Sequence, residues 1–467
     1  MNNTSKFLKN LMAAFLAQGI SLLTSVCMSF VLPKFLGIMQ YGYWQLFIFY
    51  TSYVGFFHFG FNDGLYLRIG GKQLEELDSD EIGTQFKLFL IMELVISISA
   101  IFISSIYFTN PERRFIWITT AIYLFFTNLA SCLGYIFQAV NKTKLFSLSV
   151  ILDRVFVLLF IMLLLWNKQT DFRPFIVTYT LSKAISLCYC IWHARKIVFS
   201  RFKNILESLP DMRLNFSIGI KLTIATIMSM FILGVGRIII DNIWGIESFG
   251  KISLSLSLSN FFLLFIQQVS MVMFPALRQT GNDQQRKIYN NIRSYLGLLL
   301  PAIFIAYFPL KFIVGWWLPQ YSESLRYLAL LLPLCTFDGK MQMLCNTYLK
   351  VLRQEKKLLQ FNVCAFAMSL CLCAFSGYVL RSMTCVVMSM VVSIIFRSII
   401  AEQFLSRKMG ADIRKMMVQE ITLVLVFTIS AWFCPEPVAF GLTAAAYGIY
   451  LFSNRKRIHF FQFNKYQ

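Results

Sequence analysis

Apolar residues occur in long runs from one end of the chain to the other, separated by short polar segments. A run of roughly 17–25 residues, folded as an α-helix, crosses the hydrocarbon core of a bilayer. The pattern therefore predicts an all-α polytopic membrane protein with no separate soluble domain. We expect about fourteen transmembrane helices, at residues 11–32, 43–61, 86–108, 115–137, 145–166, 175–192, 216–236, 251–273, 294–314, 325–344, 358–377, 384–404, 418–433 and 438–452.

Composition supports a membrane location and explains the charge. Hydrophobic residues make up 57% of the 467 residues and charged residues only 14%, whereas soluble domains carry about 25% charged residues. The net charge of +21 is typical of nucleic-acid binding when a chain is polar. In a chain this apolar it indicates basic loops on one side of a membrane, so no nucleic-acid partner is expected.

The distribution of Lys and Arg between the loops predicts the orientation. If the N-terminus is cytoplasmic, the cytoplasmic segments hold 27 of the 43 basic residues and the far-side loops hold 7. Cytoplasmic loops carry the excess of Lys and Arg, so both termini are expected in the cytoplasm. The basic leader at residues 6–9 precedes an apolar run longer than a signal-peptide core, which predicts a retained first helix.

The sequence also repeats itself at an interval of about 210 residues. Gly37–Gly42 and Gly245–Gly250 both read G-I-x-x-aromatic-G, 208 residues apart, and two shorter matches have offsets of 210 and 213 residues. Parallel repeats of this kind occur in alternating-access transporters, whose substrate site lies between the lobes. The predicted organisation is a six-helix lobe at 1–200, a cytoplasmic linker at 201–215, a second six-helix lobe at 216–405, and a final helix pair with a basic tail at 406–467.

Ionisable residues inside the apolar runs are candidates for function, because each costs about 2.5–3.5 kcal/mol to insert. Glu402 and Glu420 lie near run ends and are expected to reach the interface. Asp338 and Lys340 point in different directions around one helix. Lys183 and Arg397 have no carboxylate within one turn, which leaves two interpretations open: an interhelical ion pair, or a water-filled cavity that attracts an anion.

In the cavity interpretation, cations hold an anionic substrate and acids bind a coupling ion. Arginine can hold phosphate oxygens in pairs, whereas lysine acts as a point charge. The candidate substrate-binding cations are Arg154, Lys183, Lys221, Arg237 and Arg397. The candidate sites for a coupling proton or sodium ion are Glu93, Asp153 and Asp338.

An enzyme acting on lipid-linked sugars, a polysaccharide polymerase or ligase, is the alternative from another class. Such an enzyme needs a sizeable extramembrane loop, and the predicted far-side loops are short. The one D-x-D sequence, Asp78-Ser79-Asp80, lies in an acidic loop, and the three histidines are scattered. We therefore expect no catalytic residue, no bound metal and no cofactor.

Several short motifs resemble those of a known transporter family. The stretches LPKFLG (32–37), YGYWQL (41–46) and GFNDG (60–64) in the first lobe, with GVGRIIID (234–241) and FGKISL (249–254) in the second, resemble the O-antigen and polysaccharide flippase family. That family belongs to the multidrug/oligosaccharidyl-lipid/polysaccharide exporter superfamily. With the helix layout, the resemblance extends over nearly the full chain.

The resemblance implies a function as well as a V-shaped, two-lobed fold with a cationic cavity. The implied activity moves an undecaprenyl-pyrophosphate-linked oligosaccharide, the O-antigen repeat unit of lipopolysaccharide biosynthesis, from the cytoplasmic to the periplasmic leaflet of the bacterial inner membrane. Ion antiport is the implied energy source. The implied partners are membrane lipids, a polysaccharide polymerase and a chain-length regulator. A drug or small-solute antiporter of the same superfamily is the alternative within transport.

The resemblance also bears on individual residues. Asn62, Asp63, Gly64 and Asp241 lie in family-like motifs and are expected to have structural or gating roles. From the charge hypothesis, replacing Lys183 or Arg397 with alanine is expected to abolish glycan export while leaving protein abundance normal.

Overall fold

A computed structural model describes residues 16–278 and 281–455, which are helical with no β-strand, as the apolar runs predict. The basic leader at 6–9 and the basic residues 456–457 lie outside the described residues. The chain divides into two compact units, residues 1–227 and 228–467. The boundary falls inside the kinked helix α10 (Ile205–Arg278), which therefore belongs to both units.

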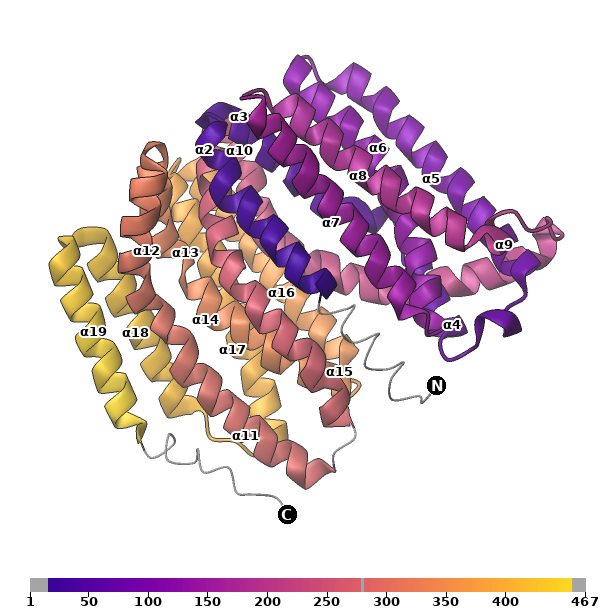
Figure 1. Ribbon diagram of the computed structural model, residues 1–467. Coiled ribbons are helices and arrows are strands. Elements are labelled where there is room, and N and C mark those ends of the chain that lie inside the picture. The colour runs from indigo at the N-terminus through magenta and orange to yellow at the C-terminus, as the bar shows by residue number, and fades with distance from the viewer. Residues whose placement is uncertain (1–15, 279–280, 456–467) are drawn as a thin grey trace. The chain divides into compact units, whose positions relative to one another are not determined.

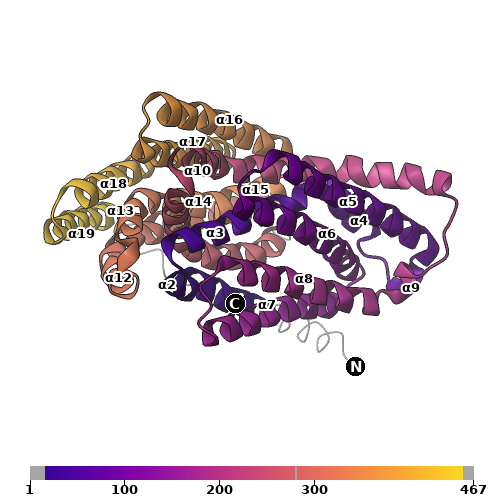
Figure 2. The ribbon, with the colours of Figure 1, turned by 90° about the horizontal axis from the view of Figure 1, so that it is seen from above.

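In the N-terminal unit, four long helices lie side by side (Figures 1 and 2). They are α5 (Ser79–Tyr107), α6 (Pro111–Ala139), α7 (Thr143–Trp166) and α8 (Phe172–His193). A first helix covers Leu16–Phe35 and includes the π-turn Cys27–Val31 and α2 (Leu32–Phe35). The shorter elements are α3 (Ile38–Tyr53), the 3-10 turn η2 (Val54–His58), α4 (Phe61–Ile69), the 3-10 turn η3 (Leu74–Glu76) and α9 (Arg195–Val198). Of these, α3, η2 and α4 pack on α6, so α6 lies at the centre of the unit.

In the C-terminal unit, α16 runs along α17 and α18 runs along α19, while α14 packs against α17 (Figures 1 and 2). The elements are α11 (Asn282–Leu299), η4 (Leu300–Ala302), α12 (Ile303–Trp317), η5 (Pro319–Tyr321), α13 (Ser322–Leu331), α14 (Pro333–Lys340), η6 (Met341–Cys345), α15 (Asn346–Val351), α16 (Glu355–Ala374), η7 (Phe375–Val379), α17 (Met383–Met409), α18 (Arg414–Phe433) and α19 (Glu436–Ser453). The helix interrupted by η6 carries Asp338 and Lys340 into the interior of this unit, where both residues are buried.

Short polar side chains fix where several helices begin. Asp78, Asn110, Asp171 and Ser382 each precede a long helix and accept a hydrogen bond from a backbone N–H of its first turn. Such caps satisfy N–H groups that have no partner within the helix. At the other end of α17, Gly410 adopts a left-handed conformation (φ 67°), which glycine allows without a steric penalty.

Where the structure describes them, the apolar runs lie mainly in helices, but fewer helices qualify as spans by length and composition alone. Among the described residues, ten helices are long and apolar enough to cross a membrane, and a bent pair, Pro319–Leu331 with Pro333–Val351, brings the total to eleven if it forms one span. The stretch Ile205–Leu264 contains most of two predicted runs. Two further runs lie in α3 with η2 and in α19, which fall outside this set. The chain is a multi-pass membrane protein, and fourteen spans remain a prediction.

The two glycines that open the repeated G-I-x-x-aromatic-G sequence occupy similar places. Gly37 lies at the break between α2 and α3 as the residue that precedes α3. Gly245 is the non-helical residue inside α10, with φ 80° and ψ −176°. Both repeats therefore mark a turn between two helices, and at Gly245 the positive φ is one that glycine adopts without a steric penalty.

Candidate functional site

Asp153 of α7 is the centre of a charged group in the N-terminal unit. Its carboxylate accepts hydrogen bonds from the Lys183 ammonium at 2.7 Å and from the Ser182 hydroxyl at 3.1 Å, both on α8. The Arg154 guanidinium lies 3.8 Å from the same carboxylate and donates to the Tyr179 hydroxyl at 3.3 Å. The structure thus brings together three of the predicted site residues, Asp153, Arg154 and Lys183.

This group has two cations for one carboxylate. The Asp153 side chain is 5% exposed, while those of Lys183 and Arg154 are 17% and 28% exposed. The carboxylate is thus enclosed and the cations are partly open to the surroundings. Among the described residues, one positive charge is left without a counter-charge, and an embedded charge of this kind is costly unless water or an anion reaches it.

Aromatic rings enclose the same group on one side. The Tyr179 ring contacts those of Trp44, Phe47 and Tyr123 at centroid distances of 5.5–5.8 Å. Trp44 and Phe47 are fully buried and hold α3 against α6 and α8. These rings are therefore part of the packed wall that orients Tyr179 toward Arg154.

Arg397 of α17 forms an ion pair with Asp338 of α14 in the C-terminal unit. The guanidinium also donates to the Ser229 hydroxyl, and the Gln342 amide donates to the second Asp338 oxygen at 2.5 Å. Lys183 and Arg397 thus each form an interhelical ion pair, and a role in binding an anionic substrate stays a prediction for both.

The two remaining predicted cations both lie on α10, far apart along the helix. Lys221 has an exposed side chain, and no carboxylate among the described residues pairs with it. Arg237 donates to the Ser253 hydroxyl at 2.8 Å and lies 4.8 Å from the centre of the Phe249 ring, across the break at Gly245. Asp241 is buried one helical turn from Arg237. Arg237 thus ties together the two arms of α10.

The Asn62-Asp63-Gly64 motif joins α4 to the first part of α10. Thr223 donates to the Asp63 carboxylate at 3.1 Å. A Cβ atom on Gly64 would lie 1.9 Å from the backbone oxygen of Asn215, so the two helix backbones are in direct contact. Arg68 adds a salt bridge to Asp211 at 2.9 Å. The motif therefore docks α10 within the N-terminal unit.

Glu93 of α5, the third predicted acid, lies in the interior of the N-terminal unit and is 0% exposed. The Asn128 side-chain amide of α6 donates to one of its carboxyl oxygens at 3.0 Å. Asn62 in turn donates to the backbone oxygen of Asn128 at 3.3 Å. Sequence reasoning missed Asn128, although an amide in the middle of an apolar run was a usable signal.

The prediction that Glu402 and Glu420 reach the interface is wrong. Both are 1% exposed or less and belong to a buried group of four charges, the charge quartet, with Arg293 and Lys340. Arg293 bonds both glutamates, reaching Glu420 at 2.7 Å, and Lys340 reaches Glu420 at 2.5 Å and Glu402 at 3.3 Å. The quartet joins α11, α14, α17 and α18 and has no net charge.

Asp338 and Lys340 do face different partners, as their spacing predicts. Asp338 belongs to the pair with Arg397, whereas Lys340 belongs to the charge quartet. Arg293 was missed because it lies one residue before a predicted span and was counted with a loop. Its long side chain extends from α11 into the interior, where only 1% of it is exposed.

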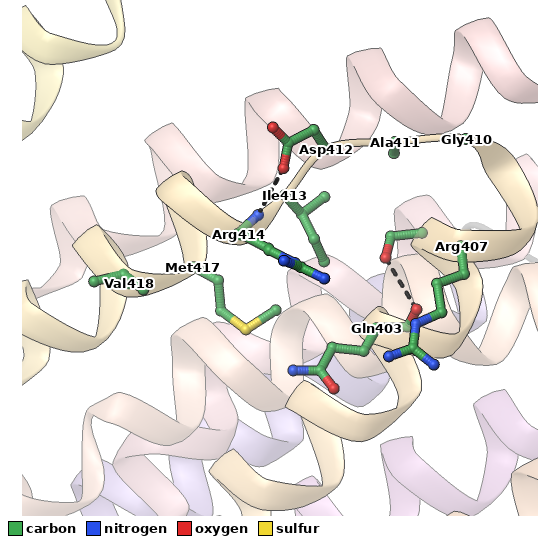
Figure 3. A pocket seen from close by; sticks show the side chains of 10 residues that line it. Gln403, Arg407, Gly410, Ala411, Asp412, Ile413, Arg414, Met417 and Val418 are labelled. Carbon is green, nitrogen blue, oxygen red and sulfur yellow. Dashed lines mark hydrogen bonds between the residues drawn. The ribbon is translucent and has the colours of Figure 1, made fainter.

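A hollow of about 660 Å³ lies between the end of α17 and the start of α18 (Figure 3). Gln403 and Arg407 line it on one side, and Asp412 and Arg414 on the other. No carboxylate among the described residues pairs with either arginine side chain. The hollow lies on the basic loop that the sequence predicts on the cytoplasmic side.

The D-x-D sequence serves to start a helix. The Asp78 carboxylate accepts bonds from the N–H groups of Asp80 and Glu81 and from the Lys203 ammonium. The bond from Lys203 holds the pKa of Asp78 below its ordinary value. The Asp80 carboxylate accepts from the Arg201 N–H at 2.9 Å. Both acids thus fasten α5 to the segment after α9.

Comparisons with known proteins place this arrangement in a family. The family model described as polysaccharide biosynthesis protein matches residues 7–281. No curated protein sequence matches the chain.

Among solved structures, the inward closed conformation of the lipid II flippase MurJ aligns with a TM-score of 0.65 at 14% identity, over 97% of this chain and 100% of MurJ. An inward-facing multidrug resistance MATE transporter of the MOP superfamily aligns with a TM-score of 0.59 at 12% identity, over 84% and 94%. A MOP-superfamily transporter from Pyrococcus furiosus aligns at 0.52 and 11% identity, over 87% and 95%. The chain therefore has the MurJ and MATE fold and belongs to the polysaccharide biosynthesis protein family.

Proposed function

We propose that the chain is a flippase for an undecaprenyl-pyrophosphate-linked oligosaccharide, the O-antigen repeat unit. It moves this lipid by alternating access from the cytoplasmic to the periplasmic leaflet of the bacterial inner membrane, coupled to an ion gradient. Membrane lipids surround it, and a polysaccharide polymerase and a chain-length regulator act on the exported product. The MurJ structure is named as a lipid II flippase, and the likeness over 97% of this chain supports a lipid as the cargo.

The excess positive charge around Asp153 carries the proposal. Arg154 and Lys183 share one carboxylate, and both cations are partly exposed. A pyrophosphate is an anion, and an arginine and a lysine offer it paired hydrogen bonds and a point charge respectively. Lys221, exposed on α10 of the same unit, adds a further cation that no carboxylate among the described residues pairs with.

Deleting the gene and assaying the cell surface tests the proposal. We expect surface polysaccharide to disappear and the lipid-linked repeat unit to accumulate on the cytoplasmic side, with both effects reversed by the wild-type gene. Unchanged surface glycan with new sensitivity to drugs would instead establish the small-solute antiporter. Loss of polymer while single repeat units still reach the periplasm would establish the polymerase.

We expect different results when the cation is removed from the Lys183–Asp153 pair and from the Arg397–Asp338 pair. Lys183→Gln leaves Asp153 beside Arg154, so we expect normal abundance with export strongly reduced. A hydrogen bond to a charged group contributes about 1.5–3 kcal/mol, or about 10- to 150-fold in affinity. The measurement is surface glycan normalised to protein level, and wild-type export at wild-type level would remove Lys183 from the mechanism.

Arg397→Gln, by contrast, leaves Asp338 with the Gln342 amide as its one side-chain partner within the described part of the chain. Breaking a buried ion pair from one side costs about 3–5 kcal/mol, so we expect abundance to fall together with export. The double variant Arg397→Gln/Asp338→Asn removes both charges and is expected to restore abundance. Export by that restored protein would show that the pair is structural, and its absence would give Arg397 or Asp338 a role in transport.

A further inference from the structure

Glu93, Asn62 and Asn128 form a buried polar group inside the N-terminal unit, and each is 1% exposed or less. They come from three elements, α5, α4 and α6. The Asn128 amide donates to Glu93 Oε2 at 3.0 Å and to the Val54 carbonyl at 3.2 Å. The Asn62 amide donates to the Asn128 carbonyl at 3.3 Å. The side-chain amides of Asn62 and Asn128 therefore donate either to another residue of this group or to the backbone of η2.

Three oxygen atoms of this group have no hydrogen-bond donor among the described residues. They are Oε1 of Glu93, Oδ1 of Asn62 and Oδ1 of Asn128. In each of these carboxyl or amide groups, the second polar atom (Glu93 Oε2, Asn62 Nδ2 or Asn128 Nδ2) forms a hydrogen bond within the group of three residues. The three oxygens therefore belong to neighbouring side chains. Buried polar atoms in native proteins are nearly always partnered, and three exceptions in one place require an explanation.

The surroundings of Glu93 supply no positive charge. No lysine or arginine among the described residues bonds to it. Among the described titratable groups, the Cys132 thiol of α6 interacts electrostatically with Glu93, while His58 of η2 and Asp63 of α4 have hydrogen-bond partners of their own. The His58 ring accepts a bond from the Gly60 N–H, and Asp63 is held by Thr223. A carboxylate here thus has a single negative charge that nothing in the described structure balances.

We propose that Glu93, Asn62 and Asn128 form a binding site for one monovalent cation, a proton or a sodium ion. A proton on Glu93 Oε1 makes that atom a donor to an asparagine oxygen. A sodium ion is bound by the unpartnered oxygens directly. Either neutralises the single charge, whereas a divalent ion would leave a net positive charge in the interior. Its role as coupling ion rests on the proposed function, but binding itself does not.

A purely structural role for Glu93 predicts a different effect of replacing it with glutamine. Glutamine has the same shape, is neutral, and offers an N–H donor to the unpartnered asparagine oxygens. If Glu93 served only to pack and hydrogen-bond, Glu93→Gln would be tolerated and would leave the response of the protein to ions unchanged. The variant therefore separates a cation site from a structural polar group.

The experiment follows the melting temperature of the purified full-length protein in detergent. Wild type, Glu93→Gln and the control Glu247→Gln, which changes an exposed acid on α10, are compared in sodium chloride and in choline chloride at equal ionic strength. The comparison is repeated across the physiological pH range. A ligand that binds the folded state alone raises its melting temperature in proportion to occupancy.

A sodium site is expected to give a rise with sodium in wild type and Glu247→Gln that is absent from Glu93→Gln. A proton site is expected to give a fall with rising pH, independent of sodium, that Glu93→Gln lacks. Wild-type responses to both ions in Glu93→Gln would overturn the proposal. If that variant does not fold, Asn62→Ala serves instead, with the midpoint of the response expected to move by about tenfold or more; an unmoved midpoint overturns it too. No lipid-linked substrate is needed, so failure here leaves the flippase proposal standing.

Discussion

Arg293→Met is expected to destabilise the C-terminal unit by about 3–5 kcal/mol, which is enough to deplete the folded protein from the membrane. The variant leaves Glu402 and Glu420 with Lys340 as their only cation among the residues that the structure describes. One buried negative charge is then unbalanced, at a place where the described side chains are 1% exposed or less. The measurements are protein abundance in the membrane and the thermal unfolding of the detergent-purified protein.

Two further variants separate charge from size. Arg293→Met/Glu402→Gln leaves Lys340 against Glu420, a balanced pair at 2.5 Å, and is expected to recover most of the lost stability. Arg286→Met changes an exposed arginine of the same helix and is expected to stay within about 0.5 kcal/mol of wild type. If the double variant were as unstable as the single one, charge balance would not explain how the charge quartet stabilises the folded protein.

Gly64→Ala is expected to displace α10 from α4 and to cost at least about 1–3 kcal/mol, the range for overpacking a close-packed contact. The new Cβ would lie 1.9 Å from the Asn215 backbone oxygen, and a backbone cannot move aside as a side chain can. Gly219→Ala is expected to act in the same way, because its Cβ would lie 1.8 Å from the Gly60 oxygen. Export and thermal stability should fall together.

Gly55→Ala is the matched control, because this glycine lies close by in η2 and a Cβ there meets no atom within 4 Å. Alanine at this position is expected to be neutral or slightly stabilising, since it restricts the unfolded chain. Equal behaviour of Gly64→Ala and Gly55→Ala would show that α10 does not need the close approach.

The helices could be predicted from the sequence because apolar runs of bilayer length have few alternatives to the helix. The pairing between helices could not. Lys183 lies 30 residues from Asp153, and Arg397 lies 59 residues from Asp338. Charge and position mark each residue as needing a partner, but which of several acids meets which cation depends on how the helices rotate and pack. That information is spread over many apolar contacts.

The missed residues show the same limit. Arg293 was assigned to a loop because a boundary error of one or two residues is normal, yet its side chain is long enough to reach Glu420. Asn128 was missed because only ionisable residues were considered, and a neutral amide in a span is also a costly group that needs a partner. Glu93 was found from its acidity, but its asparagine neighbours come from helices that the sequence does not place together.

The charge quartet also bears on how the protein is made. Synthesis proceeds from the N-terminus, so Arg293 and Lys340 leave the ribosome before either acid, and Lys340 precedes Glu402 by 62 residues. During that interval both cations lack the partners they have in the finished fold. We therefore expect α11 and α14 to be unstable in the membrane until α17 has been synthesised and supplies Glu402. Their positions should become stable only after α18 has supplied Glu420.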